Sequence, residues 1–166
     1  MNTIQDVTIR SAGPADAGAL AALRFALRSG VELVWEPEAE FVPRCTTWML
    51  QRLIPGGWWR AWVAVDGAEI VGSIWLQLIE KIPNPGEDPE LHGYVSNLYV
   101  APTHRGAGLG TRLLERCLAA CAEDVVDKIV LWPTPESRDL YERQGFSVRD
   151  DLFVRRAGAR ISLPSQ

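Results

Sequence analysis

Apolar residues in the first part of the chain recur at helical spacing. Leu20, Leu23 and Leu27 lie three or four residues apart and predict the apolar face of one helix. Pro14 precedes them, at a position where the first residue of a helix tolerates proline. The segment TIQDVTIR, residues 3–10, favours an opening strand before this helix.

A second helical pattern begins near Pro37. It places Phe41, Cys45 and Trp48 on one side, and the sequence PGG at residues 55–57 ends it. We therefore expect two consecutive helices before the next strand.

Residues 58–81 predict a β-hairpin. They are rich in β-branched and aromatic residues and turn at Asp66-Gly67, a strong two-residue turn signal. The proline-rich stretch at residues 82–90 must be a loop, and a strand over 92–100 follows it.

The second half of the chain alternates helices and strands. A helix runs from the glycine-rich bend at 106–110 to about Glu123, and KIVLW at 128–132 predicts a buried strand. Thr134 is a suitable cap for a last helix that Gly145 closes. FSV at 146–148 and LFVRR at 152–156 predict two short final strands. With no linker or repeat, the pattern indicates one α/β domain over residues 1–166.

The composition narrows the class of protein. Of 166 residues, 47% are hydrophobic and 23% charged, the balance of a soluble globular domain. The formal net charge is −4, so no global basic field favours nucleic acid or an acidic membrane as a partner. We find neither a signal peptide at the start nor an apolar run of membrane-spanning length, and we expect a cytoplasmic protein.

The three cysteines do not indicate a metal or thiol site. They lack zinc-type spacing, and Cys117 and Cys121 fall on one apolar helical stripe with Leu113 and Leu114. We therefore expect both to be small core residues, and we expect no bound metal.

Glycines gather where the strand over 92–100 passes into a helix. The first-turn N–H groups of a helix have no partner within it and attract anions. Residues 91–114 contain no Asp or Glu, although they include Arg105, Arg112 and His104. This pattern favours a phosphate cradle; the alternative is that the glycines only permit close packing of helix on strand.

Two nucleotide motifs do not fit this segment. A P-loop needs a lysine after its last glycine, but Thr111 and Arg112 follow Gly110. A dinucleotide fingerprint has the spacing GxGxxG, whereas the spacing here is GxGxG. A nucleotide-dependent enzyme is therefore disfavoured.

The glycine segment instead resembles a known family. RGAGLG, with Arg105, Gly108 and Gly110, resembles the R/Q-x-x-G-x-G/A signature of the GNAT superfamily of acyl-CoA-dependent N-acetyltransferases. SRDLYERQGF at 137–146 resembles the second signature of that family, and the order of elements agrees along the chain. The resemblance implies a single α/β domain with a mixed, mostly antiparallel sheet of about seven strands flanked by about four helices.

The resemblance also implies where acetyl-CoA binds. The pantetheine arm is expected to pair with the backbone of Leu98, Tyr99 and Val100. The pyrophosphate is expected at the loop, on Arg105, Gly106, Ala107, Gly108, Gly110 and Thr111. Where the family often has an asparagine, this chain has Thr134, and we expect Thr134 or Ser137 to take its place beside the arm.

Catalytic roles follow from the same resemblance. Tyr141 matches the usual general acid, because a phenol can protonate the leaving thiolate; the alternative is a tyrosine that only packs in the core. The general base is less defined, since the strand over 92–100 has no carboxylate. His92 and Glu80 are the candidates for the base or for holding a water molecule.

The acceptor side is expected around the connection between the first two helices. It contains Glu32, Glu36, Glu38 and Glu40, whose charges would attract an amine, and Trp35 and Tyr94 are candidate walls. The alternative is a solvated acidic helix start beside core tryptophans. A small amine is the expected acceptor, although a peptide or protein N-terminus stays open.

The leading hypothesis is an N-acetyltransferase that moves an acetyl group directly from acetyl-CoA to a primary amine. The alternative is a non-catalytic CoA-binding sensor or interaction module on the same fold. The sequence does not give the acyl-chain preference, and it leaves the oligomeric state open between a monomer and the homodimer common in such folds.

Overall fold

The computed structural model describes residues 6–30, 36–86 and 89–154. The chain divides into two compact units, residues 1–132 and residues 133–166. Each unit is described by itself below, and the single domain expected from the sequence stays a prediction.

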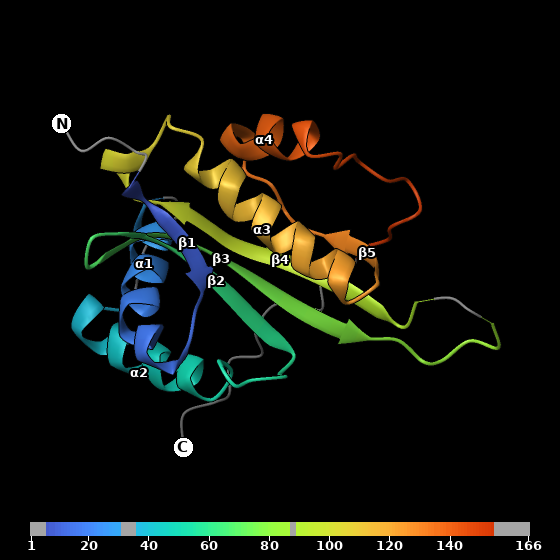
Figure 1. Ribbon diagram of the computed structural model, residues 1–166, viewed down its shortest axis with the longest axis horizontal. Coiled ribbons are helices and arrows are strands. Elements are labelled where there is room, and N and C mark those ends of the chain that lie inside the picture. Colours follow the sequence, from blue (N-terminus) through green and yellow to red (C-terminus); the bar gives the residue numbers. More distant parts are fainter. Residues whose placement is uncertain (1–5, 31–35, 87–88, 155–166) are drawn as a thin grey trace, which may run out of the picture. The chain divides into compact units, whose positions relative to one another are not determined.

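The first unit contains most of the helices and strands. In chain order they are β1 (Thr8–Ser11), α1 (Ala17–Ser29), α2 (Glu38–Leu50), β2 (Trp59–Asp66), β3 (Glu69–Glu80), β4 (Leu91–Val100), α3 (Leu109–Glu123) and β5 (Val126–Val130). The second unit contains a 3-10 turn at Pro135–Ser137 and α4 (Arg138–Arg143). This order agrees with the sequence expectation as far as α4 (Figure 1).

The strands form one mixed sheet in the order β1-β2-β3-β4-β5. Neighbours from β1 to β4 are antiparallel, and β5 runs parallel to β4. A parallel partner requires a crossover, which α3 provides between β4 and β5.

The expectation of about seven strands is not confirmed, since the described residues form five. The segments 146–148 and 152–154 have no strand structure. Their apolar side chains predicted strands, yet Val148 is 83% exposed and Phe153 is 96% exposed. Alternating apolar residues make a strand only where a hydrogen-bonded neighbour is present, and the described residues supply none.

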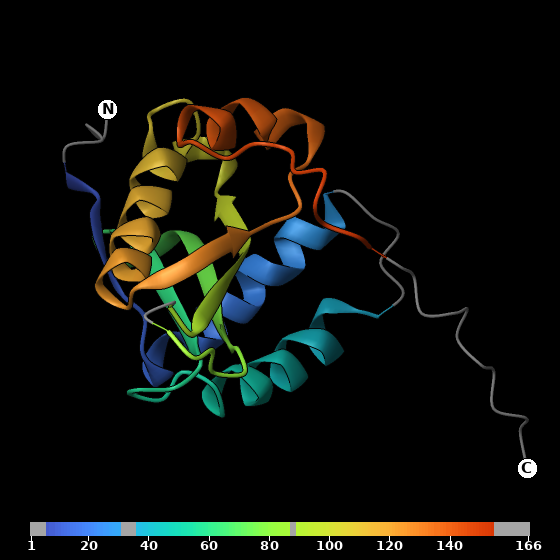
Figure 2. The same cartoon turned by 90° about the vertical axis from the view of Figure 1, so that its right-hand side faces the viewer.

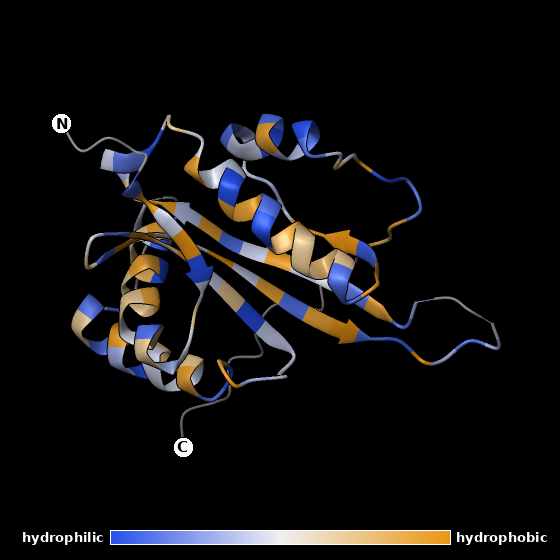
Figure 3. Cartoon of the chain, viewed as in Figure 1, coloured by the Kyte–Doolittle hydropathy of each residue, from blue (hydrophilic) through white to orange (hydrophobic). Residues whose placement is uncertain are grey.

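Helices cover both faces of the sheet. Helices α1 and α2 lie on one face, and α3 packs on β2, β3 and β4 from the other (Figure 2). On the first face, Leu20 of α1, Met49 of α2 and Trp75 of β3 belong to one buried hydrophobic cluster. On the second, Leu113 and Cys117 are fully buried. Hydrophobic and hydrophilic residues alternate in bands along α3 (Figure 3), as the stripe that contains Cys117 and Cys121 predicted.

The apolar face of α1 differs from its prediction. The helix buries Ala17, Leu20 and Ala21, whereas Leu23 and Leu27 are only half-buried. The buried face is therefore rotated by about one residue position relative to the leucine spacing, and two small alanines form part of it.

Candidate functional site

The glycine bend before α3 requires glycine for its backbone conformation. Gly106 has φ +80° and Gly108 has φ +75°, which side chains rarely adopt. A Cβ atom at either position would meet no atom within 4 Å. Close packing therefore does not explain these two glycines, and the alternative offered by the sequence fails for them.

The bend presents a row of open backbone donors. The N–H groups of residues 106–111 have no hydrogen-bond acceptor within the part of the chain that the structure describes, and the bonding of α3 begins with Arg112 N–H to the Gly108 carbonyl at 3.0 Å. These donors lie at the positive end of the α3 dipole, in a stretch without acidic residues. The arrangement suits a multiply charged anion.

Arg105 folds back onto the end of β4. Its Nε donates to the Val100 carbonyl at 2.9 Å, and its guanidinium carbon lies 5.6 Å from the centre of the Tyr99 ring. The cation is thus fixed at the rim of the bend, where it adds positive charge to the donor row.

The bend is anchored to two distant segments. His104 Nε2 lies 3.0 Å from Asp66 Oδ2 in the β2–β3 hairpin. Arg112 Nη2 donates to the Val7 carbonyl at 2.9 Å, just before β1. These contacts hold the bend in place without using the N–H groups that it presents.

Strands β4 and β5 pair over only part of their length. Their register runs from Leu91 opposite Val126 to Tyr94 opposite Val130, and residues 95–100 of β4 have no β5 neighbour. The backbone of Leu98, Tyr99 and Val100 therefore belongs to a strand with one open edge. An extended molecule could add to this edge as a further strand.

A bulge marks the point where the edge opens. Asn97 has φ +54°, and the pairing of β3 with β4 shifts between Ser73 and Trp75. Arg24 of α1 donates from Nη1 to Asn97 Oδ1 at 2.6 Å. The sequence analysis proposed neither residue.

Tyr94 lies on the α1–α2 face of the sheet at the last paired position of β4. It is opposite Gln77, which is two positions beyond the buried Trp75 on that face. Its ring contacts Trp132 edge to face, with the ring centres 5.2 Å apart. Tyr94 therefore stands beside the opening between β4 and β5, and its role as an acceptor wall stays a prediction.

The two base candidates are not brought together. His92 is two residues before Tyr94 and faces the same side; its Nε2 lies 3.3 Å from Asp127 Oδ2, which also accepts from Lys81 Nζ at 3.0 Å. Lys81 is the main cause that lowers the pKa of Asp127. Glu80 is exposed at the end of β3, on the opposite face from Ile79 and His92.

Glu36 is already paired. Arg44 donates to its two carboxylate oxygens at 3.1 and 2.5 Å, and these hydrogen bonds lower the pKa of Glu36. Its charge is therefore largely neutralised and attracts an amine less than a free carboxylate would. Trp35, the other proposed wall, lies outside the described residues, as does Glu32.

The second unit carries the remaining predicted residues. Tyr141 of α4 is 8% exposed and contacts Phe146 edge to face, with the ring centres 5.7 Å apart. Thr134 donates from its N–H to Ser137 Oγ at 2.9 Å and from Oγ1 to the same atom at 3.1 Å. Thr134 and Ser137 thus cap the start of this helical segment together.

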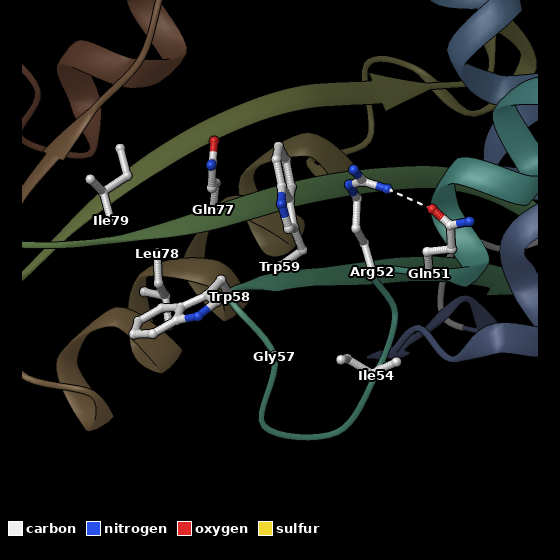
Figure 4. Close-up of a pocket in the computed structure, with 9 residues that line it drawn as sticks. All are labelled: Gln51, Arg52, Ile54, Gly57, Trp58, Trp59, Gln77, Leu78 and Ile79. Carbon is white, nitrogen blue, oxygen red and sulfur yellow. Dashed lines mark hydrogen bonds between the residues drawn. The ribbon is translucent and has the colours of Figure 1, made fainter.

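A pocket of about 540 Å³ lies elsewhere in the first unit. Its walls come from the end of α2, the start of β2 and the end of β3 (Figure 4); they are Gln51, Arg52, Ile54, Gly57, Trp58, Trp59, Gln77, Leu78 and Ile79. None of the residues predicted for the site lines it.

Two general findings concern the described residues only. No group of three or more His, Cys, Asp or Glu side chains among them could hold a metal ion. In the same ranges, no helix combines the length and the apolar character needed to cross a membrane.

Comparisons with known proteins agree on one family. Residues 27–146 match the acetyltransferase (GNAT) family. A GCN5-related N-acetyltransferase from Ralstonia eutropha JMP134 is 29% identical, covering 92% of this chain and 99% of that chain, with a TM-score of 0.75. A predicted acetyltransferase from Clostridium acetobutylicum, solved with acetyl-CoA, is 24% identical over 90% and 96% of the two chains, with a TM-score of 0.74. No curated protein sequence matches the chain.

Proposed function

The chain belongs to the GNAT acetyltransferase family, and we propose that it moves an acetyl group from acetyl-CoA to a primary amine of a small molecule. The family match confirms the resemblance found in the sequence, and acetyltransferases of this family use acetyl-CoA. One observation carries the rest of the proposal. The open edge of β4 at residues 95–100 leads directly into the row of N–H groups at 106–111, for which the described residues supply no acceptor.

The glycine bend fits the pyrophosphate of CoA. Backbone donors at the positive end of a helix bind phosphate oxygens well, and left-handed glycines keep side chains out of the way. The proposed contacts are Arg105, Gly106, Ala107, Gly108, Gly110 and Thr111. Arg105 would contribute charge from its fixed position at the rim.

The open edge of β4 fits the pantetheine arm, whose amides can pair like those of a strand. Leu98 and Tyr99 would offer backbone groups at this edge. The Val100 carbonyl already accepts from Arg105, so a ligand would share it through the second lone pair. Thr134 and Ser137 are proposed as further contacts and would act as a preformed pair.

Tyr141 is proposed as the general acid of a direct transfer. Acetyl-CoA supplies the acetyl group as a thioester, and the new C–N bond forms as the C–S bond breaks. Thiolate leaves more easily when a phenol O–H donates a proton to the sulfur. Burial and the contact with Phe146 hold the Tyr141 ring in one orientation, which favours such a donor.

His92 is the base that the arrangement favours over Glu80. The amine must lose a proton before or during transfer, and His92 shares a face of the sheet with Tyr94. With Nε2 donating to Asp127, the ring presents Nδ1 as its acceptor, which a water molecule could link to the amine.

Calorimetric titration with acetyl-CoA tests the binding site. We expect binding by the wild-type protein and a loss of at least about 10-fold in affinity for Gly108→Glu, which puts a carboxylate and a strained backbone into the anion site. Gly56→Glu is the matched control, because Gly56 also has a left-handed backbone with open space around it. Failure of the wild-type protein to bind any CoA ester would sink the proposal.

Turnover tests the role of Tyr141. We expect Tyr141→Phe to lower kcat about 10²- to 10⁴-fold, since the general acid is lost, while acetyl-CoA affinity is retained. Unchanged kcat would remove Tyr141 from the mechanism, and a matching fall in acetyl-CoA affinity or melting temperature would assign it a structural role instead.

A further inference from the structure

Arg24 occupies an unusual position on α1. It is half-buried, and its Nη1 donates to Asn97 Oδ1 at the bulge of β4. Tyr94 of β4 and Cys45 of α2 lie close enough to interact with it electrostatically, so its guanidinium lies between α1, α2 and the edge where β4 opens. Asn97 directly precedes Leu98, the first residue proposed to pair with the pantetheine arm.

Arg24 has no carboxylate partner among residues 6–30, 36–86 and 89–154. Other arginines of the chain do pair with acids; they include Arg10 with Asp16, Arg44 with Glu36, Arg60 with Asp124 and Arg149 with Asp151. Burial is the main cause that lowers the pKa of Arg24, and the nearby Arg28 lowers it further. The positive charge of Arg24 is therefore partly desolvated, and no carboxylate among the described residues neutralises it.

A purely structural role does not account for such a group. Holding the Asn97 side chain requires one donor, and a neutral amide would supply it without the cost of desolvating a cation. A guanidinium has five N–H donors, and one of them serves Asn97. The remaining donors and the charge match a carboxylate or a phosphate, which such a fork binds with two parallel hydrogen bonds.

We infer that the acceptor is a small amine that also carries an anionic oxygen group, a carboxylate or a phosphate, and that Arg24 binds this group. The inference rests on the proposed function, because the opening of β4 beside Arg24 is where the proposed donor and the acceptor meet. Tyr94 and Asn97 border the same place, so one molecule could reach Arg24 with its anion while its amine faces the thioester.

Acetylation of matched acceptor pairs tests the inference. The first arm compares L-amino acids with their amides, and the second compares phosphoethanolamine with ethanolamine, which separates carboxylate from phosphate. We expect wild-type kcat/KM to favour the anionic member of at least one arm by about 10- to 100-fold, the range for a hydrogen-bonded charge pair. We expect Arg24→Gln to remove this preference through KM, with the neutral member changed less than about 3-fold.

Two further variants and a binding measurement keep the test specific. Arg24→Lys keeps the charge without the fork and should retain part of the preference. Arg149→Gln removes an arginine that already has a carboxylate partner in Asp151, and it should leave the preference unchanged. Titration with acetyl-CoA checks that each variant still binds the donor.

The outcomes separate the inference from the proposed function. Equal use of anionic and neutral acceptors by the wild-type protein, or an undiminished preference in Arg24→Gln, would overturn the inference and leave the transferase intact. Binding of acetyl-CoA without transfer to either member of any pair would also overturn it. Absence of acetyl-CoA binding in the wild-type protein would overturn the proposed function itself, and the inference with it.

Discussion

Among single residues, Val125 has a backbone conformation that is unfavourable for its β-branched side chain. It has φ +56°, directly after the C-cap of α3, where its N–H donates to the Ala122 carbonyl at 3.2 Å. Glycine is the usual residue at such a helix end, since a β-branched side chain is strained there. The side chain is 64% exposed, so it contributes little burial in return.

We therefore expect Val125→Gly to stabilise the protein. Relief of left-handed strain is worth about 1–2 kcal/mol, and the greater freedom of glycine in the unfolded chain offsets part of it, which leaves about 1 kcal/mol. Urea unfolding monitored by circular dichroism measures the change. Val125→Ala serves as the control and should gain less, because alanine remains strained; a loss of stability in Val125→Gly would contradict the argument.

Arg24 illustrates why some residues of the proposed acceptor site were not predicted from the sequence. Arg24 continues the buried stripe of Ala17, Leu20 and Ala21 at helical spacing. A charged residue on a buried helix face could have indicated a functional residue. The spacing of the leucines, however, predicted a buried face that is rotated from the observed one and does not include Arg24. The left-handed conformation of Asn97 has no counterpart in the sequence, because a bulge depends on how two strands pair.

Among the elements, the junction of β1 and α1 depends on one ion pair. Arg10 donates to both carboxylate oxygens of Asp16, each at 2.8 Å, and the Gly13 N–H adds a bond at 2.9 Å. The hydrogen bonds from Arg10 are the main cause that lowers the pKa of Asp16 below its ordinary 3.8. The pair fastens the edge strand to the start of the first helix.

This pair predicts a defined pH dependence. Because the folded state lowers the pKa of Asp16, the unfolded chain takes up the proton more readily as the pH falls. The stabilisation is therefore fully present above the unfolded pKa and is lost as the pH falls through the folded one. We expect Asp16→Asn to cost about 1–2 kcal/mol at pH 7, reduced for the partial exposure of Arg10, and to cost progressively less below about pH 4.

Urea unfolding of both proteins between pH 7 and pH 2.5 measures this difference. Glu36→Gln is the control, since its pair with Arg44 is exposed to solvent and should contribute far less to stability. A gap between wild type and Asp16→Asn that stays constant down to pH 2.5 would show that the carboxylate charge does not matter.

The elements themselves were largely predictable. Turn residues, helix caps and apolar spacing predicted the order from β1 to α4, because these signals act within a few neighbouring residues. The hairpin turn consists of Gly67 and Ala68, one residue later than predicted, because Asp66 still pairs with Glu69; Gly67 supplies the left-handed conformation with φ +58°. The two C-terminal strands were not confirmed, since strand formation needs a partner that local patterns do not reveal.

For the molecule as a whole, the two sides of the proposed site differed in predictability. The donor side is nearly continuous in the sequence, from β4 through the glycine bend to α3, so its chemistry could be deduced from one segment. The acceptor side brings together residues as distant as Arg24 and Asn97, which only the folded sheet makes neighbours. Tyr94 was predicted for this side from the sequence and stays a prediction, whereas Arg24 was not predicted for it.

Hydrogen exchange of the full chain would locate donor binding directly. We expect saturating acetyl-CoA to slow amide exchange at residues 95–100 and 106–111, because the ligand would engage the open edge of β4 and the N–H groups of the glycine bend. At a ligand concentration about 100 times Kd, binding itself adds about 2.7 kcal/mol to the free energy of unfolding and slows exchange throughout the protein. Protection at the binding site must therefore exceed this general slowing of exchange. Residues 52–59 beside the pocket of Figure 4 report that general effect. Protection centred on Trp58 and Trp59 instead would show that acetyl-CoA binds in that pocket. In that case Gly108→Glu should leave the affinity for acetyl-CoA unchanged.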